Sequence, residues 1–182
     1  MARWGRCDYE RLILLQRRLA RFSSVDAQRF CEDCAKELAA RLIKYAIKAT
    51  PVGVYSGERY TCEAGITHKG TRKPGTVGGT LRRGWTARTE EEAQSGGKLQ
   101  SPTAYARTLP VIRSGGLYTI VVTNPVSYAS YVEYGHRTVG HKGWVVGHFM
   151  LTRAELTLRG KAEKIVEKRL IRQLQGVLNG GG

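Results

Sequence analysis

Residues 30–51 read FCEDCAKELAARLIKYAIKATP, and the apolar residues among them recur at steps of three and four. This spacing places them on one face of an α-helix. We predict a helix from about Val25 to Ala49, about 37 Å long at 1.5 Å per residue. Thr50-Pro51 ends it, because the residue before a proline disfavours the helical region. The apolar stripe consists of Phe30, Cys31, Cys34, Leu38, Leu42, Tyr45 and Ala46.

The segment before this helix predicts another one. Between about Asp8 and Phe22, apolar residues and arginines occupy opposite sides of a helical wheel. Ser23-Ser24 separates the two helices, which form either a helical hairpin or one long bent helix. The expected organisation is an N-terminal helical extension over 1–22, a single α+β domain over 23–178 and a flexible tail over 179–182.

Short strands and a closing helix are expected further along the chain. The segment LYTIVVT, Leu117 to Thr123, is the clearest strand, and the glycines of Arg113–Gly116 predict a hairpin turn before it. Weaker strands are predicted over Thr80–Arg88 and Ala104–Ile112. A short helix is predicted over Ser127–Tyr134, a loop over 136–147 and a final helix over about His148–Leu178.

These elements occur in separate helical and strand regions without a regular βαβ alternation. The predicted fold class is therefore α+β, with long N-terminal amphipathic helices, a small antiparallel β-sheet and a C-terminal helix. A doubly wound nucleotide-binding fold does not fit this order. Residues 52–79 are rich in glycine and lack periodicity, so we expect a long loop that serves as a docking segment and becomes ordered on assembly.

The chain is strongly basic. It has 182 residues, with 30 Lys and Arg against 15 Asp and Glu, for a net charge of +15. The excess is spread along the whole chain, and it favours polyanionic partners, although a charged surface that only maintains solubility fits equally well. No stretch approaches the roughly 20 apolar residues of a membrane span, and the start of the chain lacks a secretory pattern. We therefore expect a cytoplasmic protein without a membrane partner.

Patterns of catalytic or metal-binding residues are weak. Cys31 and Cys34 have the spacing of a metal-binding pair, but both belong to the apolar stripe, where a free cysteine acts as a small apolar residue. His136, His141 and His148 follow one another at intervals that match no ligand face of a helix. No Ser-His-Asp or Cys-His arrangement is recognisable. We expect no enzymatic activity and no catalytic, cofactor-binding or metal-binding residues.

Several motifs occur in an order that is familiar from one group of proteins. They are Thr50-Pro51-Val52, Leu81-Arg82-Arg83, Tyr128-Ala129-Ser130-Tyr131-Val132-Glu133-Tyr134-Gly135 and Phe149-Met150-Leu151. The set resembles the neck and tail-completion (head–tail joining) proteins of tailed bacteriophages, the gene-product-ten-like family, over roughly residues 25–178. The run from Tyr128 to Gly135 is its most specific part. A long insert after Gly53 departs from the family pattern.

The resemblance implies a non-enzymatic virion protein that forms a homo-oligomeric ring of six or twelve copies. Its place would be the head–tail junction or the head-proximal end of the tail, after assembly in the host cytoplasm. The implied partners are a connector or adaptor protein, tail tube or tail terminator proteins, and the genome DNA that passes through the channel. The alternative that the charge supports is a basic nucleic-acid-binding accessory protein without sequence specificity.

Two sets of candidate residues accompany the expected ring. Tyrosine and tryptophan are enriched in interfaces, so the candidate interface residues are Tyr128, Tyr131, Tyr134 and Trp144. The competing expectation is that at least half of these four pack in the core of the domain. Arg82 and Arg83 are candidates for basic residues that face the channel, and in a strand only one of them would point to a given face.

Overall fold

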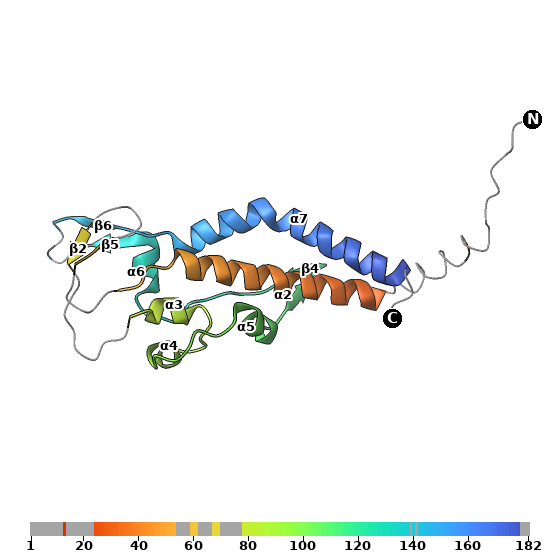
Figure 1. Ribbon diagram of the computed structural model, residues 1–182, viewed down its shortest axis with the longest axis horizontal. Helices are drawn as coiled ribbons and strands as arrows, with labels where there is room; N and C mark the ends of the chain where they lie inside the picture. The colour runs from red at the N-terminus through yellow and green to blue at the C-terminus, as the bar shows by residue number, and fades with distance from the viewer. Residues whose placement is uncertain are drawn as a thin grey trace, which may run out of the picture.

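The computed structural model describes residues 13, 24–53, 59–61, 67–69, 78–138, 140 and 142–178. Two long helices, α2 (Ser24–Ala49) and α7 (Met150–Leu178), run antiparallel along each other (Figure 1). Both confirm the helices predicted from the sequence. Within the described ranges, no helix is long and apolar enough to cross a membrane. The expected extension over 1–22, apart from Ile13, and the tail over 179–182 lie outside the described residues.

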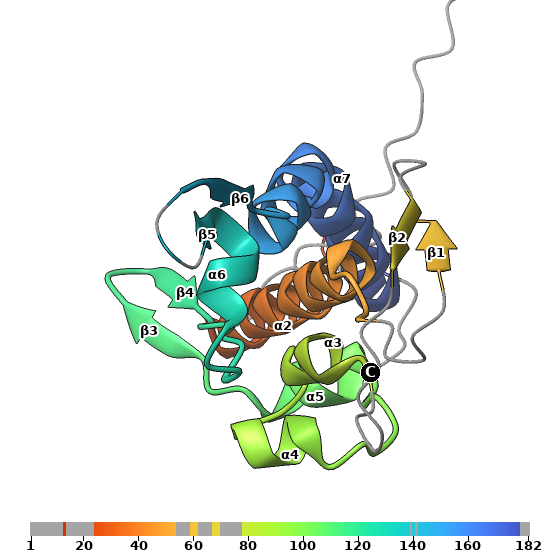
Figure 2. The same ribbon diagram turned by 90° about the vertical axis from the view of Figure 1, so that its left-hand side faces the viewer.

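Helix α2 is the centre of the fold. Helix α7 covers one side of it, and the short helices α3 (Thr80–Gly84), α4 (Glu90–Gln94) and α5 (Pro102–Thr108) lie on the other side (Figures 1 and 2). Ile43 and Ala46 of α2 are fully buried between these layers. The side chains that complete this core from other elements include Leu81, Trp85, Ala93, Tyr105, Ala106, Val126, Met150 and Ala154.

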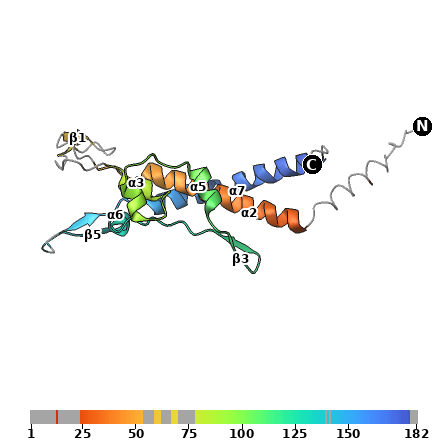
Figure 3. The same cartoon turned by 90° about the horizontal axis from the view of Figure 1, so that it is seen from below.

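The described residues contain six strands, which form three separate antiparallel hairpins. They are β1 (Arg59–Thr61) with β2 (Thr67–Lys69), β3 (Ile112–Ser114) with β4 (Leu117–Thr119), and β5 (Gly135–Arg137) with β6 (Trp144–Val146). The α+β class is confirmed, although the described strands do not join into one sheet. The hairpins β3–β4 and β5–β6 project on the same side of the long helices (Figures 2 and 3).

The hairpin predicted at Arg113–Gly116 is confirmed. Gly115 and Gly116 form its two-residue turn with φ angles of 54° and 82°, which glycine adopts without a steric penalty. The following strand is shorter than predicted, because β4 ends at Thr119. Beyond it, Ile120 and Val122 pack against the core without belonging to a sheet.

Two predicted strands are helices in the structure. Thr80–Arg88 contains α3 and the turn that follows it. Leu81 and Trp85 lie four residues apart in this segment, and both are buried. Ala104–Ile112 overlaps α5, whose first residue, Pro102, suits the start of a helix because that position needs no N–H donor. In both segments the strand prediction was wrong, because a spacing such as that of Leu81 and Trp85 fits one face of a helix as well as one face of a strand.

Two predicted loops contain strands. Residues 136–147 include most of the β5–β6 hairpin, and the described parts of residues 52–79 include β1 and β2. Strands of three residues are too short to produce a recognisable alternation. The short helix predicted over Ser127–Tyr134 is confirmed as α6 (Ala129–Tyr134). The predicted docking role of residues 52–79 falls largely on residues outside the described ranges.

Candidate functional site

Glu133 connects α6 to the beginning of α7. Its side chain is buried, and its carboxylate accepts hydrogen bonds from the backbone N–H groups of Leu151 (2.9 Å) and Thr152 (3.0 Å). The hydroxyl of Thr152 donates a third bond, at 2.8 Å. The first N–H groups of a helix lack partners within the helix, and a negative charge there is favourable. Glu133 therefore caps α7 from a neighbouring helix.

The backbone around Glu133 reinforces this junction. His148 N–H donates to the Val132 carbonyl at 2.7 Å, and Phe149 N–H donates to the Glu133 carbonyl at 3.0 Å. Gly135 has φ 85°, and a Cβ atom at this position would collide with the Val145 carbonyl oxygen. At the place where α6, the β5–β6 hairpin and α7 meet, Glu133 thus supplies the hydrogen-bond acceptors and Gly135 leaves the space that the close backbone packing needs. We call this junction, with Glu133 at its centre, the Glu133 clamp.

A second junction forms at the end of α2. Trp85 Nε1 donates to Thr50 Oγ1 at 2.7 Å, and that hydroxyl donates to the Ala46 carbonyl at 2.6 Å. Arg82 Nη2 donates to the Thr50 carbonyl, also at 2.7 Å. Because Thr50 is buried, these bonds fix α3 against the end of α2 in a low-dielectric environment. The Thr-Pro and Leu-Arg-Arg motifs therefore meet inside the fold.

The two candidate channel residues hydrogen-bond to their own chain. Arg83 donates to the carbonyl oxygens of Ala93 (2.8 Å) and Gly78 (3.0 Å), and Arg82 to that of Thr50. Both residues are half-buried on a helix, so the alternation expected of a strand does not apply to them. Their orientation toward a channel stays a prediction, while the bonds observed indicate a role in holding α3 and the loops around it.

The four candidate interface residues are all exposed. Tyr131, Tyr134 and Trp144 have exposed fractions of 59%, 64% and 59%, and Tyr128 has 40%. The expectation that at least half of them pack in the core was therefore wrong. The physical reason is that α6 turns Ala129, Val132 and Glu133 inward, Glu133 to cap α7, while the tyrosines of this segment remain outside. We call Tyr128, Tyr131, Tyr134 and Trp144 the aromatic surface.

The structure brings this surface together from α6 and the β5–β6 hairpin. Trp144 of β6 lies opposite Arg137 of β5 in the hairpin. Its indole nitrogen lies close to Gly135, on the side where any other residue would carry its Cβ atom. The rings of Tyr131 and His136 make an edge contact, with centroids 5.9 Å apart. Val145 and Val146 of β6 and Phe149, which precedes α7, are also exposed. Exposed apolar residues that gather in this way mark interaction surfaces.

The cysteine pair behaves as the apolar stripe predicts. Cys34 is buried, Cys31 is partly buried and both are free thiols. Burial raises the pKa of the Cys34 thiol, which keeps it protonated and unreactive. Among the described residues, no group of three or more His, Cys, Asp or Glu side chains could hold a metal ion.

A family model described as "Bacteriophage HK97-gp10, putative tail-component" matches residues 15–135, which is more than half of the chain. The chain belongs to this family. The resemblance to the gene-product-ten-like family is thereby confirmed, and membership indicates a phage tail component. The matched range includes Thr50, Arg82 and α6, and it ends before Trp144 and α7. Searches of curated proteins and of solved structures give no match.

The importance of Thr50 and Glu133 was not predicted, although both stand in the quoted motifs. Each is a polar residue among apolar neighbours at the end of a helix. A polar residue in such a position is the signal in the sequence that could have indicated a structural role, because a buried polar group requires a hydrogen-bond partner. The partners lie at distant positions, Trp85 for Thr50 and Thr152 for Glu133, so local sequence patterns do not identify them.

Proposed function

We propose that this HK97 gp10-like protein is a non-enzymatic virion subunit that forms a ring at the head–tail junction or at the head-proximal end of the tail. In this position it joins the connector to the tail. The observation that carries the proposal is the aromatic surface, which is exposed on a backbone held in place by the Glu133 clamp. A preorganised aromatic surface binds a partner without a large cost of ordering.

A closed ring requires two different contact patches on each subunit. The first is the aromatic surface. The second is supplied by the β3–β4 hairpin and the segment after it, where Ile112, Leu117 and Val121 are exposed. An ion pair between Arg113 and Glu32 of α2 anchors this hairpin to the body of the protein. The two patches consist of different residues on different elements, as a head-to-tail contact between copies demands.

The remaining details of the proposal come from the family. Six or twelve copies would form the ring, with a connector or adaptor protein on one side and tail tube or tail terminator proteins on the other. Genome DNA would pass through its channel, and the basic charge of the chain suits that environment. Assembly would take place in the host cytoplasm, and the assembled protein would reside in the virion without a membrane partner.

Negative-stain electron microscopy tests the proposal. The purified protein is imaged alone and after mixing with particles that lack it. Rings, or new density at the neck or the end of the tail, would support the proposal. If neither appears, the proposal fails and DNA affinity is measured at 50 and 200 mM salt. A protein that neutralises about six phosphates should lose roughly a thousandfold in affinity over that range.

A further inference from the structure

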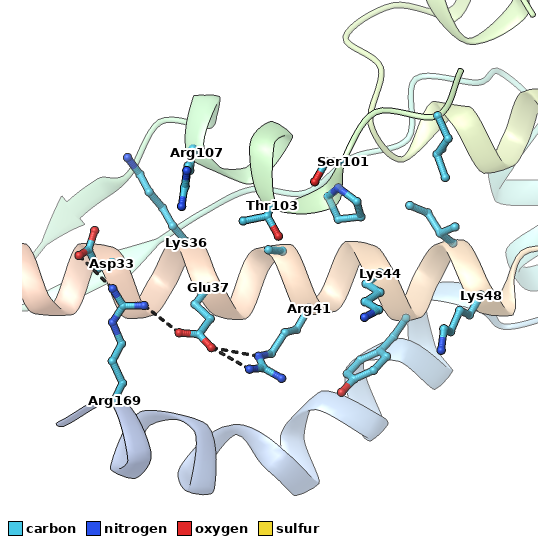
Figure 4. A pocket seen from close by; sticks show the side chains of 15 residues that line it. Asp33, Lys36, Glu37, Arg41, Lys44, Lys48, Ser101, Thr103, Arg107 and Arg169 are labelled. Atoms are coloured by element: carbon cyan, nitrogen blue, oxygen red, sulfur yellow. Dashed lines mark hydrogen bonds and ion pairs between the residues drawn. The ribbon is translucent and has the colours of Figure 1, made fainter. Parts of the chain in front are cut away.

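An open groove runs along the side of α2 between α5 and α7 (Figure 4). Its volume is about 1050 Å³. Helix α2 supplies most of the lining, the segment around α5 supplies one wall, and Arg169 of α7 reaches in from the opposite side. The groove does not include any residue of the aromatic surface, and its composition is different.

Basic residues in the groove outnumber acidic ones by six to two. The two acidic residues already have partners: Arg169 contacts Asp33 at 3.0 Å and Glu37 at 2.7 Å, and Arg41 contacts Glu37 at 2.8 Å. These pairs are drawn as dashed lines in Figure 4. In the part of the chain that the structure describes, the other four cations have no ion pair. They are Lys36, Lys44 and Lys48 of α2 and Arg107 of α5.

The unpaired lysines follow the repeat of the helix. Lys44 and Lys48 lie one turn apart, about 6 Å along α2, and Lys36 lies about 12 Å before Lys44. Carboxylates on a polypeptide have similar spacings, about 6 Å between residues i and i+4 of a helix and about 6.6 Å between alternate residues of a strand. A segment with acidic residues at these intervals would place its carboxylates opposite the lysines.

The groove also offers apolar surface. Ala40 and Ile47 are buried residues of α2 that form part of its lining, and Pro102 and Leu99 belong to the wall. Leu99 is exposed to 42%, so a partner could cover it. Positive charge beside apolar side chains suits a ligand that carries both carboxylates and apolar groups.

We propose that this groove binds an acidic polypeptide segment of a partner protein. A nucleic acid fits the groove less well. Single strands bind through bases stacked on exposed aromatic rings, and Tyr45, the aromatic residue of this groove, already has the Lys161 ammonium 5.3 Å from its ring centroid. The backbone of a duplex is contacted through phosphates and has no apolar groups to cover Leu99.

Fluorescence anisotropy tests this proposal on the isolated full-length chain, independently of ring formation. The probe is a short labelled glutamate-rich peptide with leucine at every fourth position, and the comparison ligand is a labelled single-stranded oligonucleotide of equal charge. The groove variant combines Lys44→Gln, Lys48→Gln and Arg107→Gln. The matched control removes the same charge from exposed positions of α7 through Lys164→Gln, Lys168→Gln and Arg172→Gln.

The groove variant should bind the peptide roughly tenfold more weakly than the wild type, while the control should retain most of the affinity. Leu99→Ser should weaken binding of the leucine-containing peptide but not of a polyglutamate peptide. Equal losses in the two triple variants would overturn the proposal, since net charge alone would then explain binding. Tighter binding of the oligonucleotide, with loss in the groove variant, would overturn it in favour of a nucleic acid. Thermal unfolding followed by circular dichroism verifies that each variant is folded.

Discussion

Oε1 of Glu133 accepts two hydrogen bonds from Thr152, one from the backbone N–H at 3.0 Å and one from the hydroxyl at 2.8 Å. One side chain of α6 thereby determines where α7 begins. The β5–β6 hairpin, which lies between the two helices in sequence, is held at both ends by this contact. The positions of the exposed tyrosines and of Trp144 therefore depend on the buried carboxylate of Glu133.

Replacing Glu133 should destabilise the fold. Glu133→Ala leaves the N–H groups of Leu151 and Thr152 without their acceptor, and we expect a loss of about 2–3 kcal/mol in the free energy of unfolding. Urea denaturation measures the loss. Glu155→Ala is the control, because it removes an exposed pair with Arg159 that contributes less than about 1 kcal/mol. Equal losses in the two variants would contradict the role of Glu133 as a cap.

Gly135 should tolerate substitution less well than Gly116, another glycine with a positive φ angle. Gly135 and Gly116 have φ angles of 85° and 82°, so alanine is strained at both, and the ψ angle of 173° at Gly135 lies in a region that is essentially restricted to glycine. Only at Gly135 would the new Cβ also collide with the Val145 carbonyl oxygen. Gly135→Ala should therefore lower the melting temperature further than Gly116→Ala. Equal decreases in melting temperature, measured by differential scanning calorimetry, would show that the nearby Val145 carbonyl oxygen does not limit which residue fits at position 135.

The long elements of the fold were predictable from the sequence. The period of the apolar stripe over residues 30–46 persists through several turns, so the extent of α2 follows from it, and Thr50-Pro51 gives its end. Helix α3 has only five residues, fewer than two turns, and Leu81 and Trp85 alone do not distinguish a helix from a strand. A local pattern carries little information when the element is too short to contain two full periods of its repeat.

The hydrogen bond between Trp85 and Thr50 should be measurable as a coupling. We expect Trp85→Phe and Thr50→Val to destabilise the protein individually, with an interaction energy of about 1 kcal/mol in the double-mutant cycle. Thr157→Val is the matched control, because the Thr157 hydroxyl also donates to a carbonyl four residues before it, but on the exposed part of α7. Its coupling to Trp85 should be near zero. A coupling of the same size in both cycles would contradict a specific bond.

Glu37 should contribute to stability in a pH-dependent way. Hydrogen bonding to Arg41, followed by that to Arg169, lowers the pKa of Glu37 in the folded protein below its usual value of 4.5. A lowered pKa means that the contribution is complete above the pKa of the unfolded chain and is lost as the pH falls through the folded pKa. Glu37→Gln should therefore cost roughly 0.5–1 kcal/mol at pH 7 and much less at pH 3.

The comparison for Glu37 is Glu163→Gln, an exposed residue of α7. Urea denaturation of both variants at pH 7 and pH 3 gives the two differences from the wild type. A cost of Glu37→Gln that is the same at both pH values would show that the ionised carboxylate does not stabilise the fold through its arginine partners.

The surface features of the site were only partly predictable. The residue types identified Tyr128, Tyr131, Tyr134 and Trp144 as candidates for an interface, but their exposure depends on which face of α6 meets α7. Glu133 decides that face through contacts with residues 18 and 19 positions away. The same holds for the groove, since Arg107 and Arg169 join the residues of α2 in its lining only through the tertiary arrangement.

Mass photometry of the wild type and two variants tests the central proposal, that the aromatic surface mediates ring formation. The interface variant combines Tyr131→Ser, Tyr134→Ser and Trp144→Ser, and the control replaces the exposed apolar residues Leu156 and Ile171 of α7 by serine. We expect the wild type and the control to give the mass of a closed oligomer, with the interface variant folded but monomeric. Rings that persist in the interface variant would contradict the proposal.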